Sequence, residues 1–345
     1  MTKRLVQEVL DLNTQHSRLF IEQRADRDRH HAEHPTNYAV TKCMDGRVGW
    51  SDLTLLPRGI VRPFRNIGGI FDLGWTALGM KVERYVRASF EKDRNILFVV
   101  TYHYAEGDSH RGCRGHEYDK GRSIASASAL ADQFRAVFLG CHKIYTVLVG
   151  VETDHQTLSF HGRDGRIVSM ADLADDVSTI TEVIGSLYPD MRPEIARDLV
   201  PVMSGNIRHT RDVRVAGRPP EELEHRERIV ALGEDYEWMP HNLALVIDDI
   251  ELSMDDTIGK AVGIIKGNRD AGRIPRDKAL LFACAPYEND GPERRLAELR
   301  ARKLTELGIE SIAKFHPDLQ DFFEPLTAVM DWRTRGLDVI ASPNL

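Results

Sequence analysis

The chain has 345 residues, of which 42% are hydrophobic and 29% are charged. This length allows one large or two small domains with a real core, and the composition excludes collagen-like, low-complexity and disordered classes. The formal net charge of −7 argues against general binding of nucleic acids, and no apolar run approaches the roughly 18 residues of a membrane span. Since we find no apolar leader segment, we expect a cytoplasmic protein whose four cysteines are reduced thiols or metal ligands.

The first half of the chain alternates between apolar strands and helical patterns. An N-terminal helical segment is expected within residues 1–36, with a loop at 29–35. Strands are predicted over 37–42, 59–65, 96–103 and 144–151, and helices over 75–94 and 120–139. This alternation is typical of an α/β fold with a parallel core flanked by helices, and we assign residues 37–166 to such a domain.

The second half contains a weaker version of the same pattern. Residues 167–235 are interpreted as a helical linker or insertion, and residues 236–345 as a second α/β repeat. In the repeat we expect strands over 242–247, 278–285 and 309–314, and a helix over 293–307. Segments 96–108 and 278–291 both run from an apolar strand into an acidic loop that contains glycine. The second copy has no matching cluster of Cys and His, so it is predicted to be degenerate and without metal ligands.

Two cysteines stand just where strands of the first half are expected to end. Cys43 closes the first strand, and Cys113 follows the strand at 96–103. Because the carboxyl ends of parallel strands meet at one edge of a sheet, two thiolates and an imidazole there would form a site suited to Zn²⁺. The imidazole belongs either to His103, at the strand end, or to His110, three residues before Cys113. Three protein ligands leave a fourth position for a water molecule, whose pKa zinc lowers to about 7.

Asp45 and Arg47 follow Cys43 at the second and fourth positions. Asp45 can either occupy the fourth zinc position or accept a proton from the bound water. Arg47 can hold Asp45 in a bidentate pair that keeps the carboxylate ionised. Both are therefore candidate catalytic residues, whereas His116 is expected to be a solvated loop residue.

These motifs resemble those of the β-class carbonic anhydrases. Cys43–Arg47 has the family's Cys-x-Asp-x-Arg pattern. Three later segments also resemble family segments, in the same order along the chain: Val61–Gly69, the strand at 96–103 with the His and Cys that follow it, and Val149–Asp154. The chain departs from ordinary members in the spacing before Cys113. The carboxysome shell enzymes, a divergent branch, also lengthen this spacing and also pair one live half with one degenerate half. The resemblance covers about residues 37–165.

The resemblance implies a zinc lyase, a carbonate dehydratase in which zinc-bound hydroxide attacks CO2 to give bicarbonate. It also implies a homo-oligomer or an intrachain pseudo-dimer, and a location in the cytoplasm or within a bacterial microcompartment. Three alternatives stay open. The same scaffold could hydrolyse COS or CS2; it could be a non-catalytic assembly module whose zinc is closed by both His103 and His110; or it could be a resting enzyme with Asp45 on the metal.

Overall fold

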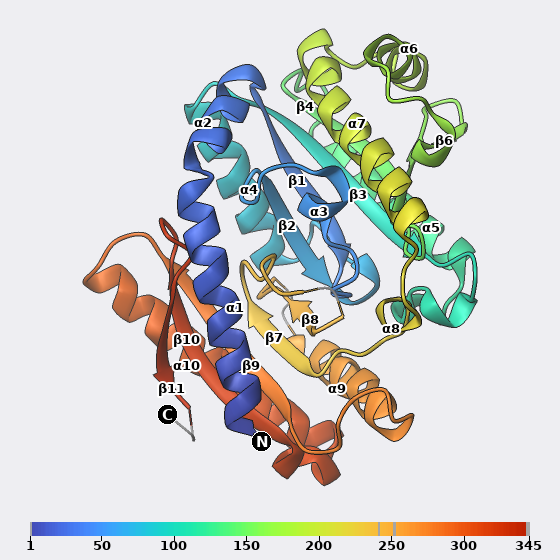
Figure 1. The fold of residues 1–345 in the computed structure, drawn as a ribbon. Coiled ribbons are helices and arrows are strands. Elements are labelled where there is room, and N and C mark those ends of the chain that lie inside the picture. The colour runs from blue at the N-terminus through green and yellow to red at the C-terminus, as the bar shows by residue number, and fades with distance from the viewer. Residues whose placement is uncertain (1, 241, 251–252, 343–345) are drawn as a thin grey trace. The chain divides into compact units, whose positions relative to one another are not determined.

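The computed structural model describes residues 2–240, 242–250 and 253–342 and divides into two compact units (Figure 1). The first-sheet unit comprises Ala25–Cys43 and Arg47–Leu223. The second-sheet unit comprises Met1–Arg24, Met44–Gly46 and Glu224–Leu345. Within the described residues, none of the helices combines the length and the apolar content that a membrane span requires.

The first-sheet unit is built on a mixed sheet with the strand order β2-β1-β3-β4-β5-β6. Neighbours among β1 to β4 pair in parallel, whereas β5 and β6 are antiparallel additions at one edge. The strands are β1 (Thr36–Cys43), β2 (Val61–Asn66), β3 (Asn95–Tyr104), β4 (Ile144–Glu152), β5 (Thr157–His161) and β6 (Ile167–Ser169). The helices are α2 (Arg24–Glu33), α3 (Trp50–Thr54), α4 (Thr76–Glu91), α5 (Lys120–Val137), α6 (Val177–Leu187), α7 (Pro193–Ala216) and α8 (Pro220–Leu223).

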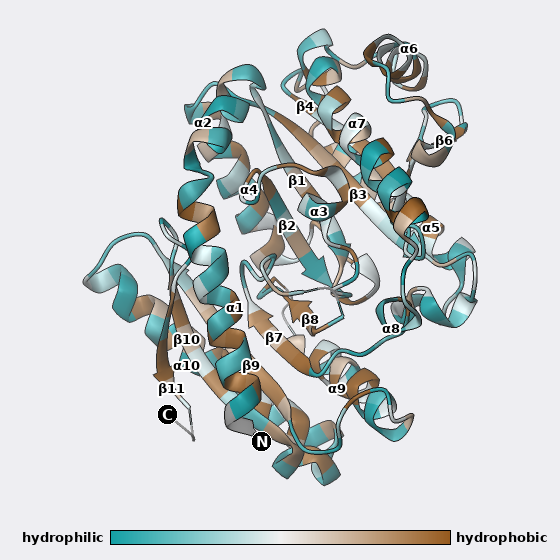
Figure 2. Cartoon of the chain, viewed as in Figure 1, coloured by the Kyte–Doolittle hydropathy of each residue, from teal (hydrophilic) through white to brown (hydrophobic). Residues whose placement is uncertain are grey.

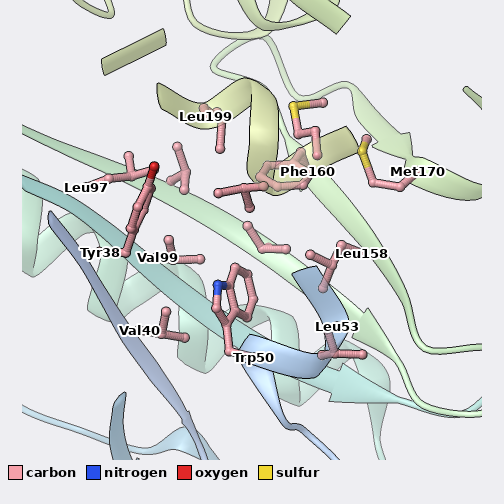
Figure 3. Close-up of a cluster of buried hydrophobic side chains, with 14 of the residues drawn as sticks. Tyr38, Val40, Trp50, Leu53, Leu97, Val99, Leu158, Phe160, Met170 and Leu199 are labelled. Atoms are coloured by element: carbon pink, nitrogen blue, oxygen red, sulfur yellow. The ribbon is translucent and has the colours of Figure 1, made fainter. Parts of the chain in front are cut away.

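Helices cover both faces of this sheet, and β3 is accordingly buried along its whole length. On one face, Leu97 and Val99 of β3 pack in a cluster with Trp50 of α3 and Leu199 of α7 (Figure 3). On the other face, the ring of Phe98 lies 4.5 Å, centroid to centroid, from that of Phe134 on α5. In the ribbon β3 is mostly brown, whereas α2 is mostly teal and β2 ends in teal (Figure 2).

The second-sheet unit has the strand order β11-β10-β9-β7-β8, and all neighbours are parallel except β10 and β11. The strands are β7 (Ile229–Gly233), β8 (Ala244–Ile247), β9 (Ala279–Tyr287), β10 (Phe323–Asp331) and β11 (Leu337–Ala341). The helices are α1 (Thr2–Glu22), α9 (Met254–Asp270) and α10 (Pro292–Phe315). Leu5, Val6 and Val9 of α1 complete its core against the central strands.

The two sheets repeat one topology. Read from β8, the order β8-β7-β9-β10-β11 reproduces β2-β1-β3-β4-β5, with parallel strands followed by one antiparallel strand. Among the described residues, each sheet also has one α-helix between its second and third strands in chain order, and one between its third and fourth. The prediction of an α/β fold with a second, degenerate repeat is confirmed.

Two local predictions were wrong. Residues 29–35 are not all loop, because α2 continues to Glu33. Residues 309–314 are not a strand, because they form the end of α10. Gly308 lies inside that helix. A Cβ at this position would lie 2.7 Å from the side chain of Leu281, so glycine is needed for close packing. The strand β7 was not predicted.

Candidate metal centre

Three potential metal ligands meet in the first-sheet unit. One ligand atom each of Cys43, His103 and Cys113 lie within 4.8 Å of one another, and all three side chains are buried. Cys43 is the last residue of β1, His103 is the penultimate residue of β3, and Cys113 follows in the connection to α5. Because β1 and β3 are parallel neighbours, their carboxyl ends bring Cys43 and His103 to the same edge.

The donor set fits zinc by both chemistry and spacing. The two Sγ atoms are 4.0 Å apart, twice the length of a disulfide bond, and both cysteines are free thiols. Two sulfur ligands at about 2.3 Å from a tetrahedral metal would be about 3.8 Å apart. Two thiolates and an imidazole are soft to borderline ligands, which favour zinc over magnesium or calcium. The residues present therefore fit a zinc ion held by three protein ligands.

The loop that carries Cys113 is fixed by its own hydrogen bonds. The Asp108 carboxylate accepts the backbone N–H of His110 at 2.9 Å, and the N–H of Tyr118 donates to the Cys113 carbonyl at 2.9 Å. Nε2 of His116 lies 2.9 Å from the Gly68 carbonyl oxygen. The expectation that His116 is solvated was wrong, because this buried contact fastens the loop to the turn after β2.

His110 does not join the group. Its side chain is 81% exposed, and its Nδ1 lies 3.3 Å from the Asp108 carboxylate. The loop folds back over residues 109–112, so the three-residue spacing to Cys113 does not point His110 at the cysteines. Of the two histidines left open by the sequence, the structure brings His103 to Cys43 and Cys113.

Asp45 and Arg47 are both buried. Arg47 donates one hydrogen bond to the carbonyl of Arg111 at 2.7 Å and another to that of Leu223 at 2.9 Å. The first of these ties Arg47 to the loop of Cys113, two residues before the thiol. Sequence reasoning did not foresee this tie, since a backbone carbonyl leaves no mark on the residue pattern.

Asp45 belongs to the second-sheet unit, where it forms an isolated antiparallel bridge with Leu245. One carboxylate oxygen each of Asp45 and Glu227 and one imidazole nitrogen of His225 lie within 4.8 Å of one another. All three side chains are buried. Sequence reasoning missed His225 and Glu227 because they lie in a charged stretch, 220–228, that reads as a solvated linker.

The second sheet has other residues where the first has its candidate metal ligands. Strands β3 and β9 both end in tyrosine, and aligning these ends sets Pro286 in the place of His103. In this alignment Val100 corresponds to Ala283. Val100 pairs with Thr41 and Ala283 pairs with Leu232, so Thr41 corresponds to Leu232. Two residues further on, Glu234 takes the place of Cys43. Proline has no side-chain donor atom for a metal, so this edge cannot repeat the first.

Comparison with known proteins agrees with this geometry. Residues 33–189 match the family described as carboxysome shell carbonic anhydrase, catalytic domain. This range contains Cys43, His103 and Cys113, together with Asp45 and Arg47. No curated protein matched the chain. The resemblance to the carboxysome shell branch of the β-class carbonic anhydrases is confirmed for this part of the chain.

Proposed function

Because residues 33–189 match a carbonic anhydrase catalytic domain of the carboxysome shell type, we propose that this chain is a zinc enzyme that interconverts CO2 and bicarbonate. The observation that carries the proposal is the buried group of Cys43, His103 and Cys113 inside the matched range. His103 is the proposed third ligand, and His110 is not a ligand. A zinc ion held there would supply Lewis-acid activation of a water molecule near neutral pH.

The chain's own residues have two proposed tasks around this centre. Asp45 accepts the proton released on hydration, as its position two residues after Cys43 suggests. Arg47 holds the loop of Cys113 through the Arg111 carbonyl, which keeps the Cys113 thiol in place. The pairing of Asp45 with Arg47 stays a prediction from their spacing in the sequence.

The test is stopped-flow CO2 hydration with purified protein whose zinc content has been measured. We expect rapid turnover and about one zinc per chain, and loss of both in Cys43→Ser and His103→Ala. His110→Ala is the matched control, because it removes an exposed histidine from the loop that carries Cys113. It should leave zinc content and turnover unchanged. Loss of zinc in His110→Ala, with retention in His103→Ala, would overturn the ligand assignment.

The same preparation separates the alternatives. Bound zinc without CO2 turnover at any pH from about 7 to 9 would favour a non-catalytic assembly module. Faster turnover of COS or CS2 than of CO2 would favour the hydrolase. Activity that appears only as the pH rises would indicate a resting state in which Asp45 occupies the metal.

We further propose that the chain works inside a bacterial microcompartment in association with its protein shell, as the matched family's description suggests. Copurification of the tagged chain with isolated shells would test this proposal, and recovery of the chain only in the free protein fraction would contradict it. Self-association into an oligomer is also proposed, and light scattering of the purified protein measures it directly.

A further inference from the structure

A buried histidine–glutamate pair lies beside Asp45 in the second-sheet unit. Nδ1 of His225 is 3.2 Å from one carboxylate oxygen of Glu227 and 3.3 Å from the other. Glu227 is fully buried, and His225 is 8% exposed. Both residues lie outside the range that matches the carbonic anhydrase family. No task in the proposed function uses either of them.

Glu227 is held in place from a neighbouring helix. Nδ2 of Asn268, on α9, donates to the Glu227 backbone carbonyl at 3.0 Å and to its carboxylate at 3.2 Å. The Asn268 amide oxygen in turn accepts a hydrogen bond from Arg273 at 2.9 Å. Burial of a carboxylate is costly unless its oxygens accept hydrogen bonds, and here the donors come from His225 and Asn268. The pair is thus a built arrangement of polar groups within an apolar unit.

The hydrogen bonds also define the chemistry of the ring. An ionised carboxylate only accepts hydrogen bonds, so Nδ1 of His225 carries the proton in this contact. In the neutral ring the basic nitrogen is then Nε2, which can take up a further proton. A carboxylate behind a histidine is a recurrent way to fix a ring and its tautomer for proton transfer.

We propose that Glu227, supported by Asn268, is a positioning residue that fixes the ring and tautomer of His225 for proton transfer next to Asp45. This inference rests on the proposed function. Hydration of CO2 by water yields bicarbonate and one proton, and that proton must reach the buffer in every cycle. His225 carries it, and Glu227 holds His225 ready to do so.

The contacts favour this reading over a second cation site. Both carboxylate oxygens of Glu227 lie within hydrogen-bond distance of the His225 ring, and one of them also accepts from Asn268. A cation would have to displace these donors. The metal content of the purified protein decides between the two readings, since a relay predicts about one metal per chain and a cation site predicts two.

The kinetic test uses Glu227→Gln, His225→Ala and His155→Ala, with zinc content measured for each. Proton export follows the release of bicarbonate, so its loss lowers kcat and leaves kcat/KM nearly unchanged. At low buffer concentration we expect kcat to fall at least about tenfold in the first two variants. Added imidazole should restore kcat in His225→Ala. His155 is the matched control, because its Nδ1 lies 3.2 Å from Glu152 in the other unit, and its removal should change neither parameter.

A second readout does not depend on activity. Nitrogen-15 spectra of the labelled histidines report which ring nitrogen of His225 is protonated, and the His225→Ala variant assigns the signal. We expect the Nδ1-protonated tautomer in the wild-type protein, both with and without zinc. Glu227→Gln should give a mixture of tautomers, because the amide offers both a donor and an acceptor to Nδ1.

Several results would overturn the inference. These are an unchanged tautomer in Glu227→Gln, an equal fall of kcat and kcat/KM in His225→Ala with full zinc, or a second metal that Glu227→Gln removes. A wild-type protein with zinc but without turnover would instead refute the proposed function, and with it the proton-carrying role. The tautomer measurement would still show whether Glu227 positions the ring.

Discussion

Asn206 of α7 offers a sharp test of how the first-sheet unit is held together. Its side chain is fully buried and reaches three backbone groups. Oδ1 accepts the N–H of Leu158 at 2.8 Å, and Nδ2 donates to the carbonyls of Leu53 at 2.9 Å and Gln156 at 3.0 Å. One amide therefore joins α7 to α3 and to the strand β5. The substitution Asn206→Ala removes all three of these hydrogen bonds.

The expected cost follows from these contacts. A typical hydrogen bond contributes about 1 kcal/mol to the free energy of unfolding, so the loss of three predicts about 3 kcal/mol. For a unit of roughly 200 residues, each kcal/mol lowers the melting temperature by about 2–4 °C, which gives a drop of roughly 6–12 °C. The helix α7 lies just beyond residue 189, where the family match ends, so a loss of this size would make α7 an integral part of the first-sheet unit.

Denaturant titration monitored by tryptophan fluorescence measures this loss, with two transitions allowed because the chain has two units. Asn289→Ala is the control, since its amide makes an exposed hydrogen bond to Glu293 and should cost less than about 0.5 kcal/mol. A cost below about 1 kcal/mol for Asn206→Ala, with the fold intact, would refute the reasoning. It would mean that water replaces the amide at no penalty.

Three further predictions concern the loop that carries Cys113, acid stability and thiol reactivity. In Gly115→Ala the new Cβ would lie 2.6 Å from the Gly68 backbone, so the loop must shift. We expect zinc to bind at least about tenfold more weakly to this variant in a chelator competition. The control is Gly185→Ala, whose new Cβ meets open space and should leave zinc binding unchanged. Burial, with smaller effects from neighbouring positive charges, lowers the pKa of His30 from 6.5 to about 4. Between pH 6.5 and 4 the unfolded chain therefore binds more protons than the folded chain, so the free energy of unfolding decreases as the pH falls through this range. In His30→Gln, the difference between the free energies of unfolding measured at pH 7 and at pH 4.5 should be smaller. Burial raises the pKa of the Cys284 thiol, so mass spectrometry should find it unmodified by a thiol reagent at pH 8 until the protein unfolds, and rapid labelling of the native protein would contradict this.

The sequence was sufficient to predict the metal group but not to choose its histidine. Strand ends carry the information, because parallel strands that end in Cys43 and His103 must meet at one edge. The position of His110 depends instead on how a loop folds, and its turn is set by backbone hydrogen bonds to Asp108 and Ser109. Residue types alone do not specify such a path.

The remaining errors arise where tertiary contacts outweigh local patterns. The helix expected over 293–307 continues to Phe315, and the glycine at 308 within it permits close packing against Leu281. The strand at 229–233 follows a charged stretch and is only five residues long, so its pattern is weak, although it is a central strand of the second sheet. The pair of His225 and Glu227 was missed for the same reason, since only the fold gathers these residues beside Asp45.

The shared strand order of the two sheets has a consequence for how the chain can change. In a symmetric homodimer a single substitution appears at both sheets, so neither edge can vary without the other. Here the two sheets are encoded separately, and Pro286 occupies the place that His103 has in the first. A mutation at the second edge leaves the candidate metal ligands of the first untouched. Duplication within one chain thus gives the protein the independence of a heterodimer while both halves are still made in equal amounts.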